Sequence, residues 1–294
     1  MMQVDVLIIG AGPAGIQAAI HSARKKVSVL MVGKPSNSAM SGTHIENYFG
    51  LSGTTDGDTM LATGLEQARS FGCRTLEENI TSSSRQGDLF VLTTENDETI
   101  EAKAVIIATG ISRKTLGVPG EKEFFGKGVS YCASCDCNFY KGKTVVIIGD
   151  ETEAAVSAEL MTRYASKVYW VVGEVTASEN VVGKAKDAGV EMVNGKVESI
   201  DGETRVTGVT VSGREIPTDG VFIELGAKSA VDLAMDMYVM PEMDDSIRVK
   251  EDCSTEVAGV FACGDITGKP WQVAKAVGQG AVAGTSAADY VKKG

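Results

Sequence analysis

Two cysteines three residues apart, Cys132 and Cys135, offer the clearest chemistry in the sequence. Thiols at this spacing either close a small redox-active disulfide or supply two ligands to a zinc ion. A zinc site needs further ligands, but the chain has no second pair of this spacing, and its two histidines, His21 and His44, lie more than 80 residues upstream. The spacing therefore favours a redox pair, and we expect no metal site.

The residues that follow this pair indicate how it would exchange protons. Asp136 comes directly after Cys135, and a carboxylate beside two thiols can carry the proton that thiol-disulfide exchange consumes or releases. The alternative is an ordinary solvated aspartate in a turn. Cys137 is a third thiol that could act in exchange, although a small buried cysteine is the simpler interpretation. The other cysteines are scattered and are expected to be buried without chemistry: Cys73, Cys253 and Cys263.

A second motif lies near the N-terminus, where Gly10-Ala11-Gly12-Pro13-Ala14-Gly15 follows the apolar run Val4 to Ile9 and precedes a helical stretch from Ile16. Glycines in such a turn let the backbone approach a pyrophosphate, and the helix N-terminus adds amide groups and a positive dipole. This context predicts a bound dinucleotide. The acidic residue that usually holds the ribose is missing, because Gly33 occupies its expected position after the next strand.

Strands and helices must hold these motifs in position, and their order in the sequence indicates an α/β fold. The strand, glycine turn, helix and strand at the N-terminus occur again about 135 residues later, where the run Thr144 to Ile148 ends at Gly149 and Lys167 to Val172 follows a helical stretch. Such wide spacing is typical of two nucleotide-binding-type domains rather than of a solenoid. The sequence thus predicts an α/β protein with two Rossmann-like domains.

The amino-acid composition of the chain limits the kinds of partner that we expect it to bind. The chain has 294 residues, of which 43% are hydrophobic, enough to fill two cores. A formal net charge of -11 would repel nucleic acid and anionic lipid. No run approaches the 18 uncharged apolar residues of a membrane span, and the first apolar run lacks a basic segment before it. We therefore expect a cytoplasmic protein with neither nucleic acid nor membrane as partner.

Taken together, the motifs resemble those of the low-molecular-weight thioredoxin reductase family over nearly the whole chain. The resemblance implies bound FAD, a homodimer, and a three-layer ββα architecture in which the second domain, carrying the cysteine pair, is inserted in the first. We expect the FAD domain to span residues 1–112 and 244–294, and the inserted domain 113–243. The matching segments are Gly10 to Gly15, Ile45 to Gly50, Ile107 to Gly110, Tyr131 to Asp136, Cys263 to Asp265 and Gln272 to Ala274.

The resemblance also implies roles for single residues. Asn47 would lie near the flavin ring, Asp265 beside the ribitol or pyrophosphate, and Gln272 with Val273 at a helix N-terminus that faces the flavin. Cys135 would exchange electrons with the flavin, Cys132 would attack the disulfide of thioredoxin, and Asp136 would act as general acid and base, with domain rotation between the two half-reactions. The remaining predicted FAD contacts are Gly10, Gly12, Pro13, Ala14, Gly15, Thr109, Gly110 and Gly264.

The chain departs from the family where NADPH would bind. The second turn reads Gly149-Asp150-Glu151-Thr152-Glu153-Ala154, so Glu151 replaces the middle glycine and adds negative charge where a pyrophosphate would approach. The next strand is followed by Gly173-Glu174 and not by the family's arginines, which would grip a 2'-phosphate. Similar relatives from anaerobes have lost these motifs, and some take electrons from ferredoxin or a reduced deazaflavin.

The leading hypothesis is therefore a thioredoxin reductase with an electron donor other than NADPH. Three alternatives stay open on the sequence alone. Drift could hide a working NADPH site; the pair could serve a small-molecule dithiol or disulfide; or the chain could be a flavin-binding redox sensor. An intact cysteine pair followed by Asp136 favours the enzymatic readings, because a sensor has no evident need for a proton carrier.

Overall fold

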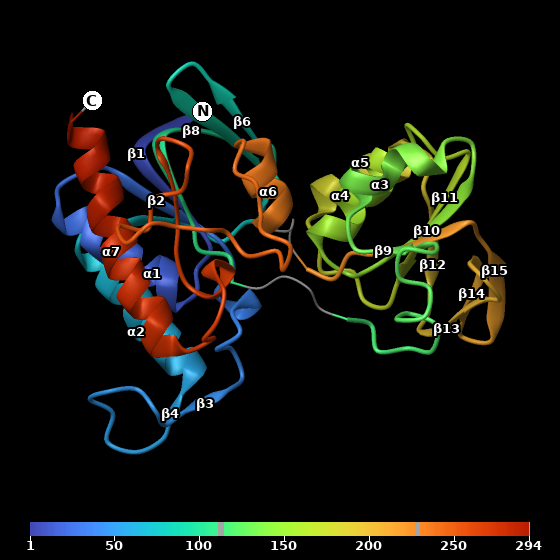
Figure 1. Ribbon diagram of the computed structural model, residues 1–294, viewed down its shortest axis with the longest axis horizontal. Helices are drawn as coiled ribbons and strands as arrows, with labels where there is room; N and C mark the ends of the chain where they lie inside the picture. The colour runs from blue at the N-terminus through green and yellow to red at the C-terminus, as the bar shows by residue number, and fades with distance from the viewer. Residues whose placement is uncertain (111–114, 227–229, 294) are drawn as a thin grey trace. The chain divides into compact units, whose positions relative to one another are not determined.

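The computed structural model describes residues 1–110, 115–226 and 230–293, and these form two compact units (Figure 1). The first unit combines Met1–Ile111 with Ala230–Gly294, and the second comprises Ser112–Ser229. The chain thus leaves the first unit, builds the second and returns.

A mainly parallel sheet forms the centre of the first unit. Parallel strands follow the order β5 (Arg74–Leu76), β2 (Val29–Val32), β1 (Met2–Ile9) and β8 (Thr99–Ile107), and β17 (Val260–Ala262) pairs in parallel with the end of β8. Antiparallel strands β7 (Leu89–Thr94) and β6 (Ile80–Gln86) continue the sheet from the beginning of β8. A small hairpin joins β3 (His44–Ile45) to β4 (Thr55–Asp56).

The central strands of this sheet bury both faces. The helices of the unit are α1 (Pro13–Arg24), α2 (Gly57–Ser70), α6 (Ala230–Asp236) and α7 (Val273–Lys293), with single 3-10 turns η1 (Pro35–Asn37) and η3 (Asp265–Thr267). Alternate residues point to opposite sides of a strand, so Val6 and Ile8 of β1 pack toward α1, α2 and α7, whereas Leu7 and Ile9 pack on the other side with residues of β7 and α6. The near-continuous apolar runs in the sequence follow from this double burial.

Helix α7 lies directly against α1, because small residues on α7 let the two backbones approach. A Cβ atom added to Gly280 would lie 2.3 Å from the carbonyl oxygen of Ala14, and one added to Gly284 would lie 2.3 Å from that of Ala18. The Ser22 hydroxyl also donates a buried hydrogen bond of 2.9 Å to the Gly284 carbonyl. This contact joins the two ends of the chain and holds the glycine turn before α1 in place.

We expect Gly284→Val to destabilise the first unit, because backbone atoms of α1 cannot move aside without shifting the helix. The cost should be about 1–3 kcal/mol or more of unfolding free energy, as for other overpacked cores. Thermal and urea denaturation would measure it. Gly278→Val, on the same helix with nothing within 4 Å of the new Cβ, is the matched control; equal losses in the two variants would contradict the close-packing account.

The second unit repeats the layered plan with a fully parallel sheet. The sheet runs in the order β12 (Glu191–Asn194), β11 (Lys167–Val172), β10 (Thr144–Ile148), β16 (Gly220–Ile223) and β9 (Val129–Ser130). An antiparallel sheet consists of β13 (Val197–Gly202), β14 (Val206–Val211) and β15 (Arg214–Pro217). The helices are α3 (Ala133–Asp136), α4 (Thr152–Met161) and α5 (Glu179–Asp187), with the 3-10 turn η2 (Cys137–Tyr140).

The parallel sheet of this unit lies between helices and the antiparallel sheet. Val145 and Ile147 of β10 pack with the alanines of α4, whereas Val146 and Ile148 pack with Ile200 and other residues of the antiparallel sheet. One core therefore lies on each face. This arrangement confirms the α/β fold class with Rossmann-like parallel sheets. The antiparallel sheet, the parallel sheet and the helices are the three layers of the ββα architecture.

The chain rejoins the first unit earlier than residue 244. Helix α6 and the segment after it pack on the β7 side of the first sheet through Leu233, Ala234 and Met237, and the Ser83 hydroxyl donates to the carbonyl of Leu233 at 3.2 Å. The inserted unit therefore ends at Ser229 by its contacts, not at residue 243. The boundary expected at residues 112 and 113 lies outside the described residues.

In the parts of the chain that the structure describes, no helix is both long and apolar enough to span a membrane.

Candidate functional site

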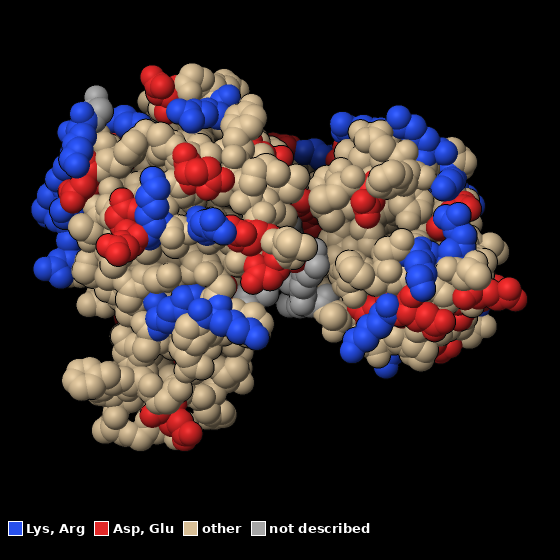
Figure 2. Space-filling model, in the orientation of Figure 1, with Lys and Arg blue, Asp and Glu red and all other residues tan. Residues whose placement is uncertain are grey.

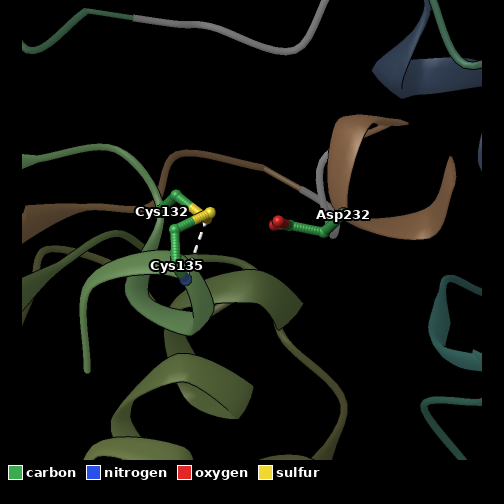
Figure 3. A group of neighbouring side chains, drawn as sticks. All are labelled: Cys132, Cys135 and Asp232. Atoms are coloured by element: carbon green, nitrogen blue, oxygen red, sulfur yellow. Dashed lines mark hydrogen bonds between the residues drawn. A yellow bond between two sulfur atoms is a disulfide. The ribbon is translucent and has the colours of Figure 1, made fainter. Parts of the chain in front are cut away.

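Cys132 and Cys135 form a disulfide at the start of α3, with their Cα atoms 5.4 Å apart (Figure 3). Cys132 is the residue that precedes the first turn of this short helix, and a helical turn brings residues three apart onto one side. Cys132 is half-buried and Cys135 is exposed.

Backbone amides around the disulfide are held by specific acceptors. The amide of Cys135 donates to Cys132 Sγ at 3.2 Å, the dashed line in Figure 3, and the amide of Cys132 donates to the Ser130 hydroxyl at 3.1 Å. The amide of Ala133 donates to Glu224 Oε1 at 2.8 Å. Sequence reasoning missed Glu224, a carboxylate at the end of an apolar run whose partner lies 91 residues earlier.

The two residues after the pair differ in their surroundings. Asp136 is half-buried at the end of α3, within reach of water. Burial raises the pKa of Tyr140, and the nearby charge of Asp136 raises it further. Cys137 is buried, and its thiol donates to the carbonyl of Ser134 at 3.4 Å. Asp136 thus reaches solvent, whereas Cys137 packs in the core, as the simpler interpretation expected.

The remaining cysteines are also buried, in the first unit. Desolvation raises the pKa of the Cys73 thiol to about 11 and that of Cys253 to about 11, and it raises the pKa of Cys263 as well. A thiol that does not ionise is a poor nucleophile. The expectation that these three cysteines are buried is confirmed.

In the first unit, the glycine turn between β1 and α1 has the close contacts that its motif predicts. A Cβ on Gly10 would lie 2.3 Å from the Ala108 carbonyl oxygen, and a Cβ on Gly15 would lie 1.9 Å from the Gly10 carbonyl oxygen. Gly10 also has a positive φ of 112°. The turn ends at the N-terminus of α1, whose first residue is Pro13. These positions accept only glycine, and they leave the helix N-terminus open to an anionic group.

The other residues predicted to contact FAD gather at the same edge of the sheet. Thr109 and Gly110 follow β8, and Gly264 and Asp265 follow β17, which pairs with β8 in parallel. A Cβ on Gly264 would lie 2.8 Å from that of Ala14, so the two turns touch. At the beginning of α7, the amide nitrogen of the Asn47 side chain donates to Gln272 Oε1 at 3.0 Å, next to Val273. The fold therefore brings together residues from four separate segments.

Two buried polar atoms in this group have no partner within the described residues: Thr109 Oγ1 and Asp265 Oδ1. Burial raises the pKa of Asp265, and the charge of Lys275 opposes that shift. Lys275 Nζ donates to the carbonyl oxygens of Gly264 and Gly268. Buried polar groups normally have partners, so a hydroxyl and a carboxylate left unsatisfied beside a dinucleotide turn fit a ligand rich in hydroxyl groups.

In the corresponding turn of the second unit, Asp150 accepts hydrogen bonds from neighbouring backbone amides. The Asp150 carboxylate accepts a hydrogen bond of 2.7 Å from the Gly173 amide, and its backbone carbonyl accepts from the amides of Thr176 and Ala177. Glu151 precedes α4, and Glu153, 7% exposed, lies in its first turn. These carboxylates already complement the positive end of the helix dipole. A phosphate at this helix would meet negative charge where it needs donors.

Comparison with known proteins identifies the family of this chain. A family model described as pyridine nucleotide-disulphide oxidoreductase matches residues 4–280. The thioredoxin reductase of Listeria innocua serovar 6a is 35% identical over 306 residues, covering 98% of this chain and 94% of its own. The atypical thioredoxin reductase TRi from Desulfovibrio vulgaris Hildenborough is 33% identical, covers 98% of both chains and has a TM-score of 0.84.

A ferredoxin-flavin thioredoxin reductase from Clostridium acetobutylicum is similar over the full length of both chains, with 33% identity and a TM-score of 0.70. The family resemblance read from the motifs is confirmed, and so is the expectation of an oxidoreductase. The chain belongs to the pyridine nucleotide-disulphide oxidoreductases and, among them, to the thioredoxin reductases, as a flavoprotein whose redox disulfide joins Cys132 and Cys135.

Proposed function

We propose that this flavoprotein passes electrons from FAD through Cys132 and Cys135 to thioredoxin, and that its FAD is reduced by a donor other than NADPH, such as ferredoxin or a reduced deazaflavin. The observation that carries the donor part is the second turn, closed by Asp150 and made acidic by Glu151 and Glu153. The cysteine pair beside it is intact. The intact pair supports delivery of electrons to a partner disulfide, and the acidic turn supports a donor other than NADPH.

The residues at the first sheet edge would hold the cofactor. Gly10, Gly12 and Gly15 make room for the pyrophosphate, and Thr109 and Asp265 offer their unsatisfied atoms to hydroxyl groups. When bound, FAD supplies the ability to collect single electrons and release them as a pair. The further proposed contacts are Pro13, Ala14, Asn47, Gly110, Gly264, Gln272 and Val273.

At the disulfide, each residue has one proposed task. Cys135 exchanges electrons with the cofactor, and Cys132 forms the mixed disulfide with thioredoxin. Asp136, half-buried and close in sequence, delivers and accepts the protons that the exchange requires. The protein would act as a cytoplasmic homodimer in which the unit carrying the pair rotates between the cofactor and the partner.

Binding of NADPH is disfavoured by both missing and added groups. Loss of two charge-assisted hydrogen bonds from an arginine pair costs about 1.5–3 kcal/mol each, or roughly two to four orders of magnitude in affinity. Repulsion by Glu151 and Glu174 adds to this cost. Ferredoxin is an adequate donor, because about -400 mV against about -270 mV for thioredoxin provides about 6 kcal/mol for two electrons. One solved relative carries ferredoxin in its name.

A ferredoxin would have to dock on a protein of net charge -11. On the face drawn in Figure 2, lysine and arginine side chains occur close to acidic ones on both units. Lys122 and Lys127 are exposed on either side of the exposed Glu123. Local basic side chains are therefore available for an acidic partner in spite of the overall charge.

Anaerobic titration of the bound flavin tests the donor directly. Reduced ferredoxin or reduced deazaflavin should bleach the flavin absorbance stoichiometrically, and adding thioredoxin with its own disulfide should restore the absorbance. NADPH should leave the spectrum unchanged at concentrations that fully reduce a conventional NADPH-dependent reductase measured alongside. Full reduction by NADPH would refute the donor part of the proposal, and reoxidation by a small disulfide but not by thioredoxin would refute the partner.

A further inference from the structure

The carboxyl edge of the parallel sheet in the second unit contains a buried carboxylate, that of Glu224. In open α/β sheets, ligands bind outside the carboxyl ends of the strands where the strand order reverses. Here that point lies between β10 and β16, because the chain proceeds from β10 to β11 on one side and places β16 on the other. Gly149 follows β10 and Glu224 follows β16. Glu224 is only 5% exposed.

The backbone of Glu224 is fixed by the sheet. Its amide donates to the carbonyl oxygen of Ile148 at 2.8 Å, which continues the pairing of β10 with β16. A Cβ on Gly149 would lie 2.1 Å from the carbonyl oxygen of Glu224, so only glycine permits this approach. The side chain therefore projects from a rigid part of the unit.

The Glu224 side chain reaches the turn that carries the disulfide. Its Oε1 atom accepts the hydrogen bond of 2.8 Å from the amide of Ala133, the residue that follows Cys132. The first amides of a helix have no partner within the helix, and a carboxylate is a strong acceptor for them. Ala133 is 1% exposed and packs in the core beside the sheet. The contact ties the beginning of α3 to the end of β16.

We propose that Glu224 is a positioning residue for the redox pair: its hydrogen bond to the Ala133 amide holds the turn in the conformation that keeps the sulfur of Cys132 close to that of Cys135. Tight positioning raises the effective concentration of one thiol toward the other and favours the disulfide over the dithiol. The inference rests on the Cys132–Cys135 disulfide alone. It does not depend on which donor or partner the protein uses.

Equilibrium with dithiothreitol measures this effect. Dithiothreitol loses two electrons and two protons as it closes its own disulfide, while the bond between Cys132 and Cys135 breaks and two thiols form. Holoprotein is equilibrated anaerobically in buffers of varied ratio, quenched by alkylation, and analysed by mass spectrometry of the peptide that carries both cysteines. At equilibrium the dithiol fraction depends on the buffer ratio and on the relative stability of the protein's disulfide and dithiol, and not on the route by which the electrons arrive.

We expect Glu224→Ala to shift the equilibrium about 10-fold toward the dithiol, the effect of losing one hydrogen bond to a charged group. Glu224→Gln, which keeps an acceptor oxygen at the same length, should stay within about threefold of the parent because a neutral hydrogen bond retains part of that energy. Glu224→Asp keeps the charge but falls one methylene short, and should shift like Glu224→Ala. If Glu224→Ala does not fold, the equilibrium measured for Glu224→Asp tests the proposal in its place.

Glu215→Ala is the control, since Glu215 is an exposed glutamate on β15 of the same unit. It should leave the equilibrium unchanged. The proposal is overturned if Glu224→Ala and Glu224→Asp match the parent protein. It is also overturned if Glu224→Gln shifts as far as Glu224→Ala, because the charge and not the hydrogen bond would then set the equilibrium.

Discussion

Cys135→Ser should abolish disulfide reduction while the flavin stays bound. One thiol cannot close or open a disulfide, so turnover should fall by about 10³-fold or more, as when an enzyme loses its nucleophile. The residues proposed to hold FAD lie in the first unit, so the ratio of flavin to protein should not change. Turnover with a chemically reduced flavin and thioredoxin as acceptor measures the first effect, and the absorbance spectrum measures the second.

Cys137→Ser is the matched control, because the same chemical change falls two residues later. A serine hydroxyl can replace the thiol as donor to the Ser134 carbonyl, so we expect turnover close to that of the parent. If Cys135→Ser retained substantial turnover, the electrons would have to reach the partner by a route that bypasses the pair. Loss of turnover in Cys137→Ser with an unchanged melting temperature would instead make the third thiol part of the reaction.

The second large effect concerns cofactor retention. Gly15→Ala places a Cβ 1.9 Å from the carbonyl oxygen of Gly10, so the turn between β1 and α1 must open. We expect the purified variant to retain about a tenth or less of the parent's flavin and to lose about 1–3 kcal/mol of unfolding free energy, as for a steric insertion into a packed site. The flavin-to-protein ratio after gel filtration and thermal denaturation measure the two losses.

Gly278→Ala makes the same substitution in α7, at an exposed glycine with no atom within 4 Å of the new Cβ. Alanine favours a helix over glycine by about 1 kcal/mol, so this variant should be as stable as the parent or slightly more so, with full flavin. A Gly15→Ala protein that keeps all of its flavin would show that the turn does not contact the cofactor.

The strands of the cores were predictable because burial on both faces leaves long apolar runs. The runs Thr144 to Ile148 and Lys167 to Val172 are strands β10 and β11 with the same bounds. Strand β6 was missed since its sequence, Ile-Thr-Ser-Ser-Ser-Arg-Gln, is polar and lies at a sheet edge. The hairpin of β3 and β4 has two residues in each strand, too few to show a period.

The site was predictable where its chemistry lies in consecutive residues, as in the cysteine pair and the first glycine turn. It was not predictable where a contact joins distant segments. Glu224 resembles the end of any strand until the fold places it against Ala133. In the same way, the sequence shows Asp150 only as one more acidic residue in a glycine motif that is incomplete. The structure alone shows that its carboxylate accepts a hydrogen bond from the Gly173 amide. Helix α6 belongs to the first unit because of its tertiary packing, which no local sequence pattern predicts.

The discontinuous first unit has a consequence for synthesis on the ribosome. Strand β17, which pairs with β8, and helix α7, which covers α1, are made after the inserted unit. The inserted unit is continuous in sequence and can fold as soon as it emerges, as domains generally do. The nascent protein can therefore fold its disulfide-bearing unit before the first unit is complete, and a cofactor held by the proposed contacts at Gly264, Asp265 and Val273 would be captured in full only after α7 has emerged.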